Sequence, residues 1–315
     1  MYSVAIIGSG PAGLACAELL AKNGLEVLVF DELKEFGGMV AYGIPEFRIP
    51  LSLTRERISE LQKKGIRFQT KKVTSVKLLL KSFGGEFDFV VLAIGAGEGA
   101  KAGFKGEESD CVIDAIDFLM QAKLDKKLIL KKDESVAVIG GGNAAVDAAR
   151  TALRQCKDVT ILYRRTEEEM PALRAEIKAA KEEGVKIDFL VAPKELIDVP
   201  ENKMGEGKAK ELICSKMILG EKDASGRKKP IDSGKVCTYL LDKLIVAVGQ
   251  NQELLWLEKD GVHIFRGLVK TDLSGKTSLD KVYACGDCVS GAKTIGEAVK
   301  AGVTVAKAIM LQVKK

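Results

Sequence analysis

The run at residues 4–13 constrains the fold more than any other part of the chain, because an apolar segment there leads into three closely spaced glycines. The apolar residues predict a buried strand, and Gly8, Gly10 and Gly13 allow a tight turn into a helix that begins near Pro11. In such a turn the middle glycine leaves room for a pyrophosphate, and the positive end of the helix dipole faces the anion. We therefore expect a dinucleotide to bind at Gly8, Ser9, Gly10, Pro11, Ala12 and Gly13.

Asp31 supplies the acid that such a site uses to hold a ribose. It ends a second apolar run, residues 26–31, at about the 20-residue spacing that is usual for this motif. A glycine turn alone can be a structural corner between a strand and a helix. The strand before the turn, the helix pattern after it and the acid together favour dinucleotide binding over that alternative.

The same pattern recurs at residues 135–145, where an apolar run is followed by Gly140, Gly142, Asn143 and Ala144. Alanine replaces the third glycine, which the motif tolerates. The next apolar run ends in Arg164 and Arg165 in place of an acid. Two guanidinium groups there suit the 2′-phosphate of NADPH and make NADH the less favoured ligand. The alternative is that these arginines pair with the neighbouring acids at residues 167–169.

Composition excludes several classes of function. The 315 residues are enough for about two domains, and a net charge of +5 with lysines spread among acids argues against a nucleic-acid partner. No apolar run reaches about 18 residues and no basic leader precedes the first strand, so we expect neither a membrane span nor a signal peptide. The seven scattered cysteines do not resemble a secreted disulfide framework, and we expect a cytoplasmic protein.

Strands alternate with helices along most of the chain, which predicts an α/β protein with doubly wound parallel sheets. We expect two Rossmann-like domains, with the second inserted into the first: a discontinuous FAD-binding domain at 1–108 and 250–315, and an NAD(P)H-binding domain at 109–249. Residues 112–122 predict a connecting helix, and residues 294–312 a long amphipathic helix. Residues 193–239 predict antiparallel strands around a tip loop at 221–230.

Several further motifs resemble those of reductases with two dinucleotide domains. The glycine turn and Asp31 are accompanied by Ala93-Ile94-Gly95 and by Gly286-Asp287 with Thr294 further on. Residues 37–50, together with the segments at 140–143, 163–165 and 170–172, narrow the resemblance. The chain is similar to the small subunit of glutamate synthase and to the matching domains of dihydropyrimidine dehydrogenase and of NADH-dependent ferredoxin:NADP oxidoreductase.

The resemblance implies which further residues line the cofactors. It assigns to FAD, besides the first turn and Asp31, the residues Gly38, Met39, Arg48, Gly95, Gly286, Asp287 and Thr294. It also implies that the strand end with Ala247 and Gly249 joins the second turn at the NADP site. Hydride transfer between the two cofactors needs no side-chain acid or base, so we name no catalytic residue and expect no metal site.

The expected function is transfer of a hydride from NADPH to FAD and of electrons onward to a partner. The family members commonly carry iron–sulfur clusters before the first glycine motif, whereas this sequence starts at the motif. We therefore expect the clusters on a partner subunit of the glutamate synthase type or on a ferredoxin, and a hetero-oligomer. Two alternatives remain: a reductase that uses Cys285 and Cys288 as a redox pair, and a subunit that binds dinucleotides without catalysis.

Overall fold

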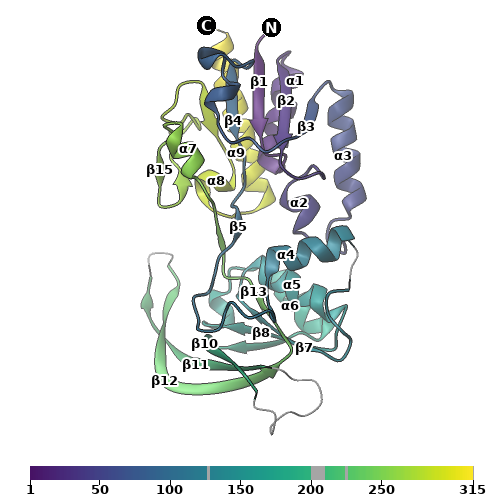
Figure 1. The fold of residues 1–315 in the computed structure, drawn as a ribbon, viewed down its shortest axis with the longest axis vertical. Helices are drawn as coiled ribbons and strands as arrows, with labels where there is room; N and C mark the ends of the chain where they lie inside the picture. Colours follow the sequence, from purple (N-terminus) through teal and green to yellow (C-terminus); the bar gives the residue numbers. More distant parts are fainter. Residues whose placement is uncertain (126–127, 200–209, 224–225, 315) are drawn as a thin grey trace. The chain divides into compact units, whose positions relative to one another are not determined.

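The computed structural model describes residues 1–125, 128–199, 210–223 and 226–314. The chain divides into two compact units (Figure 1). Unit 1 comprises Met1–Tyr42, Glu46–Glu98 and Gln250–Lys315, and unit 2 comprises Gly43–Pro45 and Gly99–Gly249. The sequence-based boundaries lie after residues 108 and 249. Gly43–Pro45 groups with unit 2, where the buried Lys123 donates a hydrogen bond of 2.6 Å to the carbonyl oxygen of Ile44.

Unit 1 is built on a five-stranded parallel sheet with the order β17-β4-β1-β2-β3. The chain enters at the central strand β1 and moves first to one side and then to the other, so the strand order reverses between β1 and β4. In open α/β sheets, ligands bind outside the carboxyl ends of the strands at such a reversal. The strands of this sheet are β1 Ser3–Ile7, β2 Glu26–Asp31, β3 Arg67–Thr70, β4 Phe89–Leu92 and β17 Val282–Ala284.

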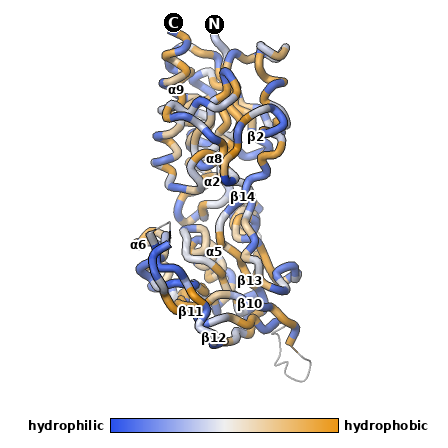
Figure 2. Tube along the Cα trace, turned by 90° about the vertical axis from the view of Figure 1, so that its left-hand side faces the viewer, coloured by the Kyte–Doolittle hydropathy of each residue, from blue (hydrophilic) through white to orange (hydrophobic). Residues whose placement is uncertain are grey.

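Both faces of this sheet are covered, because alternate residues of β1 enter two different cores. Val4 and Ile6 pack with α1 and α9, whereas Ala5 and Ile7 pack with α7 and the segments around it. Along α9 the tube in Figure 2 alternates between hydrophobic and hydrophilic colours, as expected of a helix with one buried stripe. The helices of unit 1 are α1 Pro11–Lys22, α2 Met39–Tyr42, α3 Leu51–Lys63, α7 Leu255–Lys259, α8 Asp287–Ser290 and α9 Ile295–Val313, with 3-10 turns at Lys77–Leu79 and Lys81–Phe83.

Two further sheets consist of two short strands each. Strands β15 and β16 form one two-stranded sheet, and β5 and β14 form another at the two places where the chain leaves and re-enters unit 1. Their bounds are β5 Glu98–Gly99, β14 Gln250–Asn251, β15 Ile264–Phe265 and β16 Leu268–Val269.

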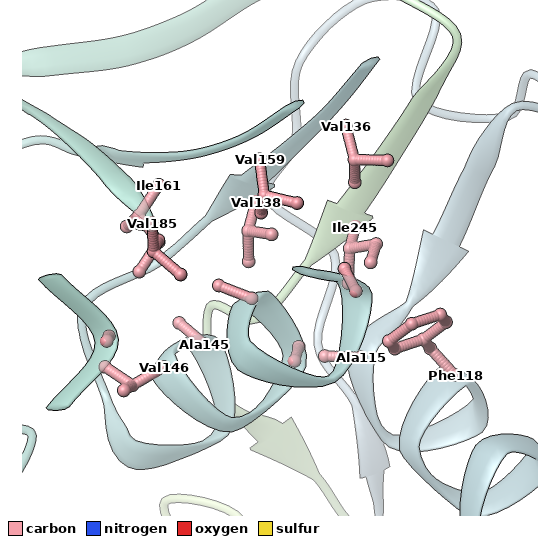
Figure 3. Close-up of a cluster of buried hydrophobic side chains, with 14 of the residues drawn as sticks. Ala115, Phe118, Val136, Val138, Ala145, Val146, Val159, Ile161, Val185 and Ile245 are labelled. Atoms are coloured by element: carbon pink, nitrogen blue, oxygen red, sulfur yellow. The ribbon is translucent and has the colours of Figure 1, made fainter. Parts of the chain in front are cut away.

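Unit 2 repeats the same plan around β7, with the parallel order β6-β13-β7-β8-β9. Val136 and Val138 of β7 belong to one hydrophobic cluster with Ala145 and Val146 of α5 (Figure 3). The parallel strands and helices of this unit are β6 Val112–Asp114, α4 Ala115–Met120, a π-helical turn Gln121–Asp125, β7 Ser135–Ile139, α5 Asn143–Leu153, β8 Asp158–Tyr163, a 3-10 turn Glu167–Glu169, α6 Arg174–Glu183, β9 Lys186–Phe189 and β13 Lys243–Val246.

An antiparallel sheet covers the other face of the unit 2 sheet. Ala137 and Ile139 of β7 pack in one core cluster with Leu212 and Cys214 from this second sheet. Its strands are β10 Val191–Asp198, β11 Lys210–Lys222 and β12 Lys228–Leu241, in that order (Figure 1). The described part of the segment predicted as antiparallel strands is therefore antiparallel, and residues 200–209 of it lie outside the described chain. Strand β11 ends at Lys222 and β12 begins at Lys228, both within the predicted tip loop at 221–230, of which residues 224 and 225 are also outside the described chain.

One predicted helix is partly wrong. The segment at 112–122 begins with strand β6, whose Val112 and Ile113 pair in parallel with Leu244 and Ile245 of β13. Asp114 then caps α4, because its Oδ1 accepts a hydrogen bond of 2.8 Å from the Ile116 N–H. Of the helices that the structure describes, none combines the length and the apolar character that crossing a bilayer requires.

Candidate dinucleotide sites

The first glycine turn joins β1 to α1 and can be built only from glycine at two of its three positions. Gly8 has a φ of +105°, and a Cβ on it would lie 2.2 Å from the carbonyl oxygen of Ala93 at the end of β4. A Cβ on Gly13 would lie 2.1 Å from the carbonyl oxygen of Gly8. The turn is therefore pressed against the neighbouring strand and against its own helix.

Gly10 differs from the other two glycines, because a Cβ on it would meet no atom within 4 Å. It is the N-cap of α1, Pro11 follows at the first helical position, and no side chain caps the helix. The open space at Gly10 thus lies in front of a helix N-terminus whose N–H groups have no side-chain acceptor. This combination fits a phosphate group.

Asp31 is held at the end of β2 by Ser9, which is completely buried. The Ser9 N–H and hydroxyl donate hydrogen bonds of 2.8 and 2.5 Å to Asp31 Oδ2, and the Leu33 N–H donates one of 3.1 Å to Oδ1. The Ser9 hydroxyl oxygen in turn accepts a bond of 2.9 Å from the Gly37 N–H. A carboxylate has about four acceptor sites, so these three bonds fix Asp31 and leave it capacity for a ligand hydroxyl.

The loop after β2 returns to the same turn. A Cβ on Gly38, whose φ is +56°, would lie 2.7 Å from the Cα of Gly10. Met39 follows directly as the first residue of α2 and is half-buried. Arg48, further along the loop, is also half-buried.

The end of β17 reaches the turn from the opposite end of the sequence. Gly286 has a φ of +78°, and its Cβ position lies 2.8 Å from the Cβ of Ala12 in the first turn of α1. Asp287 comes next, and burial raises the pKa of its carboxyl group. Gly95, after β4, accepts a hydrogen bond from the side-chain amide of Gln252, a residue that the sequence did not single out.

The N-terminus of α9 is built differently from that of α1. The Thr294 hydroxyl accepts a bond of 3.3 Å from the Glu297 N–H, and the Glu297 carboxylate accepts one of 3.1 Å from the Thr294 N–H. This capping box satisfies N–H groups of the kind that have no side-chain acceptor at the start of α1. Thr294 therefore has a structural task at the helix start in addition to its expected place beside FAD.

The second glycine turn, between β7 and α5, repeats the first. Gly140 has a φ of +142°, and a Cβ on it would lie 2.2 Å from the carbonyl oxygen of Ala247. A Cβ on Gly142, the N-cap of α5, would meet no atom within 4 Å, and no side chain caps the helix. Asn143 and Ala144 open α5, and the Asn143 Oδ1 accepts a bond of 2.9 Å from the Leu173 N–H.

Tyr163 and Gly249 complete the surroundings of this turn. The ring of Tyr163 lies where a Cβ on Gly141 would be, at 2.3 Å, and its hydroxyl donates a bond of 2.7 Å to the Glu169 carbonyl. Gly249 has a φ of +137° and accepts a hydrogen bond of 2.9 Å from the Ala100 N–H. The aromatic ring thus explains why glycine stands between Gly140 and Gly142.

Arg164 and Arg165 have different environments, although the sequence treats them alike. Arg165 is buried: its guanidinium donates a bond of 2.6 Å to Asp223 and one of 2.7 Å to the Lys228 carbonyl, both on the β11–β12 hairpin. Arg164 is exposed, and within the described part of the chain it makes no ion pair. The alternative of pairing with the acids at residues 167–169 does not apply, because the partner of Arg165 is Asp223.

Cys285 and Cys288 are both buried thiols in this structure. Burial raises the pKa of Cys285 well above its usual value, and it raises that of Cys288 to about 12. The Cys288 thiol donates to the Cys285 carbonyl at 3.2 Å. A redox-active pair needs at least one thiol that solvent can reach, and both of these are buried, so this environment does not support a disulfide-exchange role. Among the described residues no cluster of metal-ligating side chains is present.

Comparison with known proteins places this arrangement in a family. The family model of pyridine nucleotide-disulphide oxidoreductases matches residues 2–302. The NADP(+)-dependent formate dehydrogenase subunit beta of Moorella thermoacetica is 36% identical over 311 residues, covering 97% of this chain and 43% of that protein. The glutamate synthase (NADPH) small chain of Escherichia coli is 34% identical over 324 residues, covering 98% of this chain and 68% of that protein. The chain thus spans only part of each relative.

Solved structures show the same fold. FprA from Mycobacterium tuberculosis, in complex with NADPH, superposes with a TM-score of 0.79 at 18% identity, covering 99% of this chain and 84% of FprA. Thioredoxin reductase from Lactococcus lactis superposes with a TM-score of 0.75 at 20% identity over 100% of both chains. The predicted α/β class with parallel sheets is confirmed.

Proposed function

The chain belongs to the pyridine nucleotide-disulphide oxidoreductase family and is an oxidoreductase, and from this premise we propose that it transfers electrons from NADPH through FAD to a partner protein. The observation that carries the proposal is the pair of open glycine turns. Each lies at the carboxyl end of the central strand of its own parallel sheet, before a helix without a side-chain cap. Two such sites in one chain suit two dinucleotides.

Unit 1 is the proposed FAD site. The space in front of Gly10 fits the pyrophosphate, and Asp31, fixed by Ser9, would hold the ribose hydroxyls. Gly38 and Gly286 approach the same turn, which supports a role for Met39 and Asp287 in lining the rest of the cofactor. Gly95, Arg48 and Thr294 remain proposed FAD residues on the resemblance alone.

Unit 2 is the proposed NADPH site. Gly142 would face the pyrophosphate, with Gly140, Asn143, Ala144, Ala247 and Gly249 around it. Arg164 is the proposed 2′-phosphate ligand, because it is exposed at the end of β8 and carries no competing ion pair in the described chain. Arg165 would support this position by holding the hairpin through Asp223.

The chemistry that FAD supplies when bound is acceptance of a hydride from NADPH and release of its two electrons to an acceptor. The chain's own residues bind and orient the two cofactors, and correct orientation accounts for much of the rate of such a transfer. We propose an acceptor protein that carries iron–sulfur clusters. The iron–sulfur clusters are what the resemblance implies. Support for a partner comes from the names of the relatives, which include the small chain of a glutamate synthase and the beta subunits of a formate dehydrogenase and of an NADPH-Fe(3+) oxidoreductase.

Anaerobic titration tests the proposal. The purified protein should carry about one FAD per chain, and addition of NADPH should bleach the flavin absorption, with NADH much less effective. A protein that binds FAD but is not bleached by either nicotinamide cofactor would be a dinucleotide-binding subunit without catalysis. A protein that retains no FAD after reconstitution would contradict the assignment of unit 1.

A further inference from the structure

Two cysteines of unit 2 stand directly opposite each other in an antiparallel ladder. Cys214 lies in β11 and Cys237 in β12, and the strand register pairs them. Opposite residues of an antiparallel pair project to the same side of the sheet. Both side chains accordingly enter the same hydrophobic cluster, beneath the antiparallel sheet.

The backbone spacing of such a pair suits a disulfide bond. Directly opposite residues in an antiparallel ladder have Cα atoms about 4.5–5.5 Å apart, and disulfides need about 4.4–6.8 Å. The Cα separation expected of this register therefore lies within the range that a disulfide spans. Both cysteines are free thiols in this structure.

Cys237 is accessible to a small oxidant, whereas Cys214 is not. Cys237 is half-buried and lines a cavity of about 470 Å³, together with Lys216, Met217 and Tyr239. Cys214 lies opposite it on the neighbouring strand and is completely buried. Cys237 can thus react with an oxidant that enters from solvent, and Cys214 can then attack the oxidised Cys237 sulfur to form the disulfide.

We propose that Cys214 and Cys237 form a reversible disulfide when the protein meets a peroxide. The O–O bond of the peroxide breaks as one oxygen binds the Cys237 sulfur, which becomes a sulfenic acid, while water or an alcohol leaves. The Cys214 sulfur then attacks the Cys237 sulfur, the S–O bond breaks and the S–S bond forms. The released hydroxide takes the Cys214 proton and leaves as water, so two thiols are oxidised and one peroxide is reduced.

The attack of the Cys214 sulfur on the Cys237 sulfenic acid is the slower of the two steps. Burial raises the pKa of Cys214 to about 12, so little thiolate is present at neutral pH. The strand pairing keeps the Cys237 sulfenic acid beside Cys214 for as long as it survives, and this proximity compensates for the slow attack by Cys214. The disulfide would tie β11 to β12 in the hairpin whose far end, through Asp223 and Lys228, binds Arg165.

Unit 1 offers an internal comparison. Cys16 and Cys285 also share one hydrophobic cluster, and the Cys16 thiol contributes to the raised pKa of Cys285. Both are buried, and neither lines a described cavity. These two thiols should therefore remain reduced under conditions that oxidise Cys214 and Cys237.

The test is peptide mapping of the FAD-loaded protein after treatment with hydrogen peroxide. Remaining thiols are alkylated in denaturant before digestion. We expect a cross-linked pair of peptides that contains Cys214 and Cys237, has lost two hydrogen atoms and separates after dithiothreitol treatment. Cys237→Ser should abolish this species. Cys111→Ala, which removes another thiol of the same hydrophobic cluster, should leave it intact.

Two outcomes would overturn the proposal. In one, Cys214 is fully alkylated in the peroxide-treated protein while Cys237 is oxidised beyond the sulfenic acid. In the other, Cys237 is found only in disulfides between two chains. Either result would mean that the two sulfurs do not meet within the hairpin.

Discussion

The two glycine turns have nearly the same backbone geometry, but they are followed by opposite charges. In both, the first glycine has a positive φ, and its Cβ position lies 2.2 Å from a carbonyl oxygen of the neighbouring strand, that of Ala93 or of Ala247. In both, Gly10 or Gly142 faces open space. The next strand ends in Asp31 in unit 1, whereas in unit 2 it ends at Tyr163 and Arg164 follows directly. On the proposed function, the backbone of each turn would provide the phosphate site, and one side chain after the following strand would select the nucleotide.

The helices that follow the turns are anchored by ion pairs of inverted sign. In unit 1 the acid is on the first helix: Glu18 of α1 pairs with Arg57 and Lys64. In unit 2 the cation is on the first helix: Arg150 of α5 pairs with Glu176 and Glu183 of α6. The geometry of the turn therefore does not depend on which partner carries which charge. We call the cluster of Glu18, Arg57 and Lys64 the unit 1 clasp, and the cluster of Arg150, Glu176 and Glu183 the unit 2 clasp. The two clasps differ in burial, since the Arg150 side chain is 10% exposed and the Arg57 side chain 40%.

The largest effect should come from a side chain in the open space of one turn. Gly10 has φ −68° and ψ 176°, which any residue adopts, so Gly10→Val should fold. Its side chain would occupy the proposed pyrophosphate position and weaken FAD binding at least about 1,000-fold, or about 4 kcal/mol. Flavin content after gel filtration and a Kd from reconstitution measure this.

Gly142→Val is the matched variant in the other turn, since Gly142 has φ −86° and ψ 176°. It should keep FAD and lose NADPH-driven bleaching. If instead Gly142→Val released FAD and Gly10→Val did not, the two units would have to exchange cofactors.

Breaking the buried clasp of unit 2 should have the next largest effect. Arg150→Ala would leave Glu176 and Glu183 without their main partner in a partly buried site, and should lower the free energy of unfolding by about 3 kcal/mol. Glu18→Gln, in the exposed clasp of unit 1, should cost less than about 1 kcal/mol. Urea denaturation of the two variants measures both values. Equal losses would show that burial does not distinguish the clasps.

Low pH should weaken the unit 2 clasp and so lower the stability of the folded protein. Hydrogen bonds from Arg150 and then from Arg154 lower the pKa of Glu183 from 4.5 to about 2. Because the folded value is the lower one, this stabilisation is complete above the unfolded pKa and is lost as the pH falls from 4.5 toward about 2. Thermal unfolding at pH 5 and pH 3 should therefore show a smaller acid destabilisation for Arg150→Ala than for the parent protein.

Cofactor choice should depend on one arginine of the pair. Arg164→Ala should raise the KM for NADPH about tenfold, or about 1.4 kcal/mol, and leave NADH use unchanged, because only NADPH carries the phosphate. Arg165→Ala should instead lower thermal stability and affect both cofactors alike, since its partners are Asp223 and the Lys228 carbonyl. Steady-state kinetics with both cofactors would reject the assignment if Arg164→Ala impaired NADH and NADPH equally.

The smallest effect should come from the buried cysteines of unit 1. Cys285→Ser and Cys288→Ser should leave NADPH-driven reduction of an artificial dye nearly unchanged, because the dye takes electrons from the flavin and both thiols are inaccessible. A large loss of dye reduction in either folded variant would restore the alternative in which these cysteines carry electrons.

The local parts of the fold could be predicted because their signals lie within a few residues. The expected helix at 294–312 is α9, Ile295–Val313, and Thr294 followed by Glu297 forms the capping box that starts it. The residues missed depend on distant partners. Val112 and Ile113 form a strand only because β13 lies beside them, and the partner of Arg165 stands 58 positions later in the sequence. No local pattern contains that information.

The pairing of α1 with α9 determines the order in which the protein can mature on the ribosome. A Cβ on Gly302 would lie 2.0 Å from the carbonyl oxygen of Ala12, so α9 packs directly on the first turn of α1. Strand β17 likewise completes the sheet beside β4. The first glycine turn emerges early, but it cannot acquire its full surroundings until α9 has been translated. Unit 2 consists almost entirely of one continuous segment and can fold while unit 1 still waits.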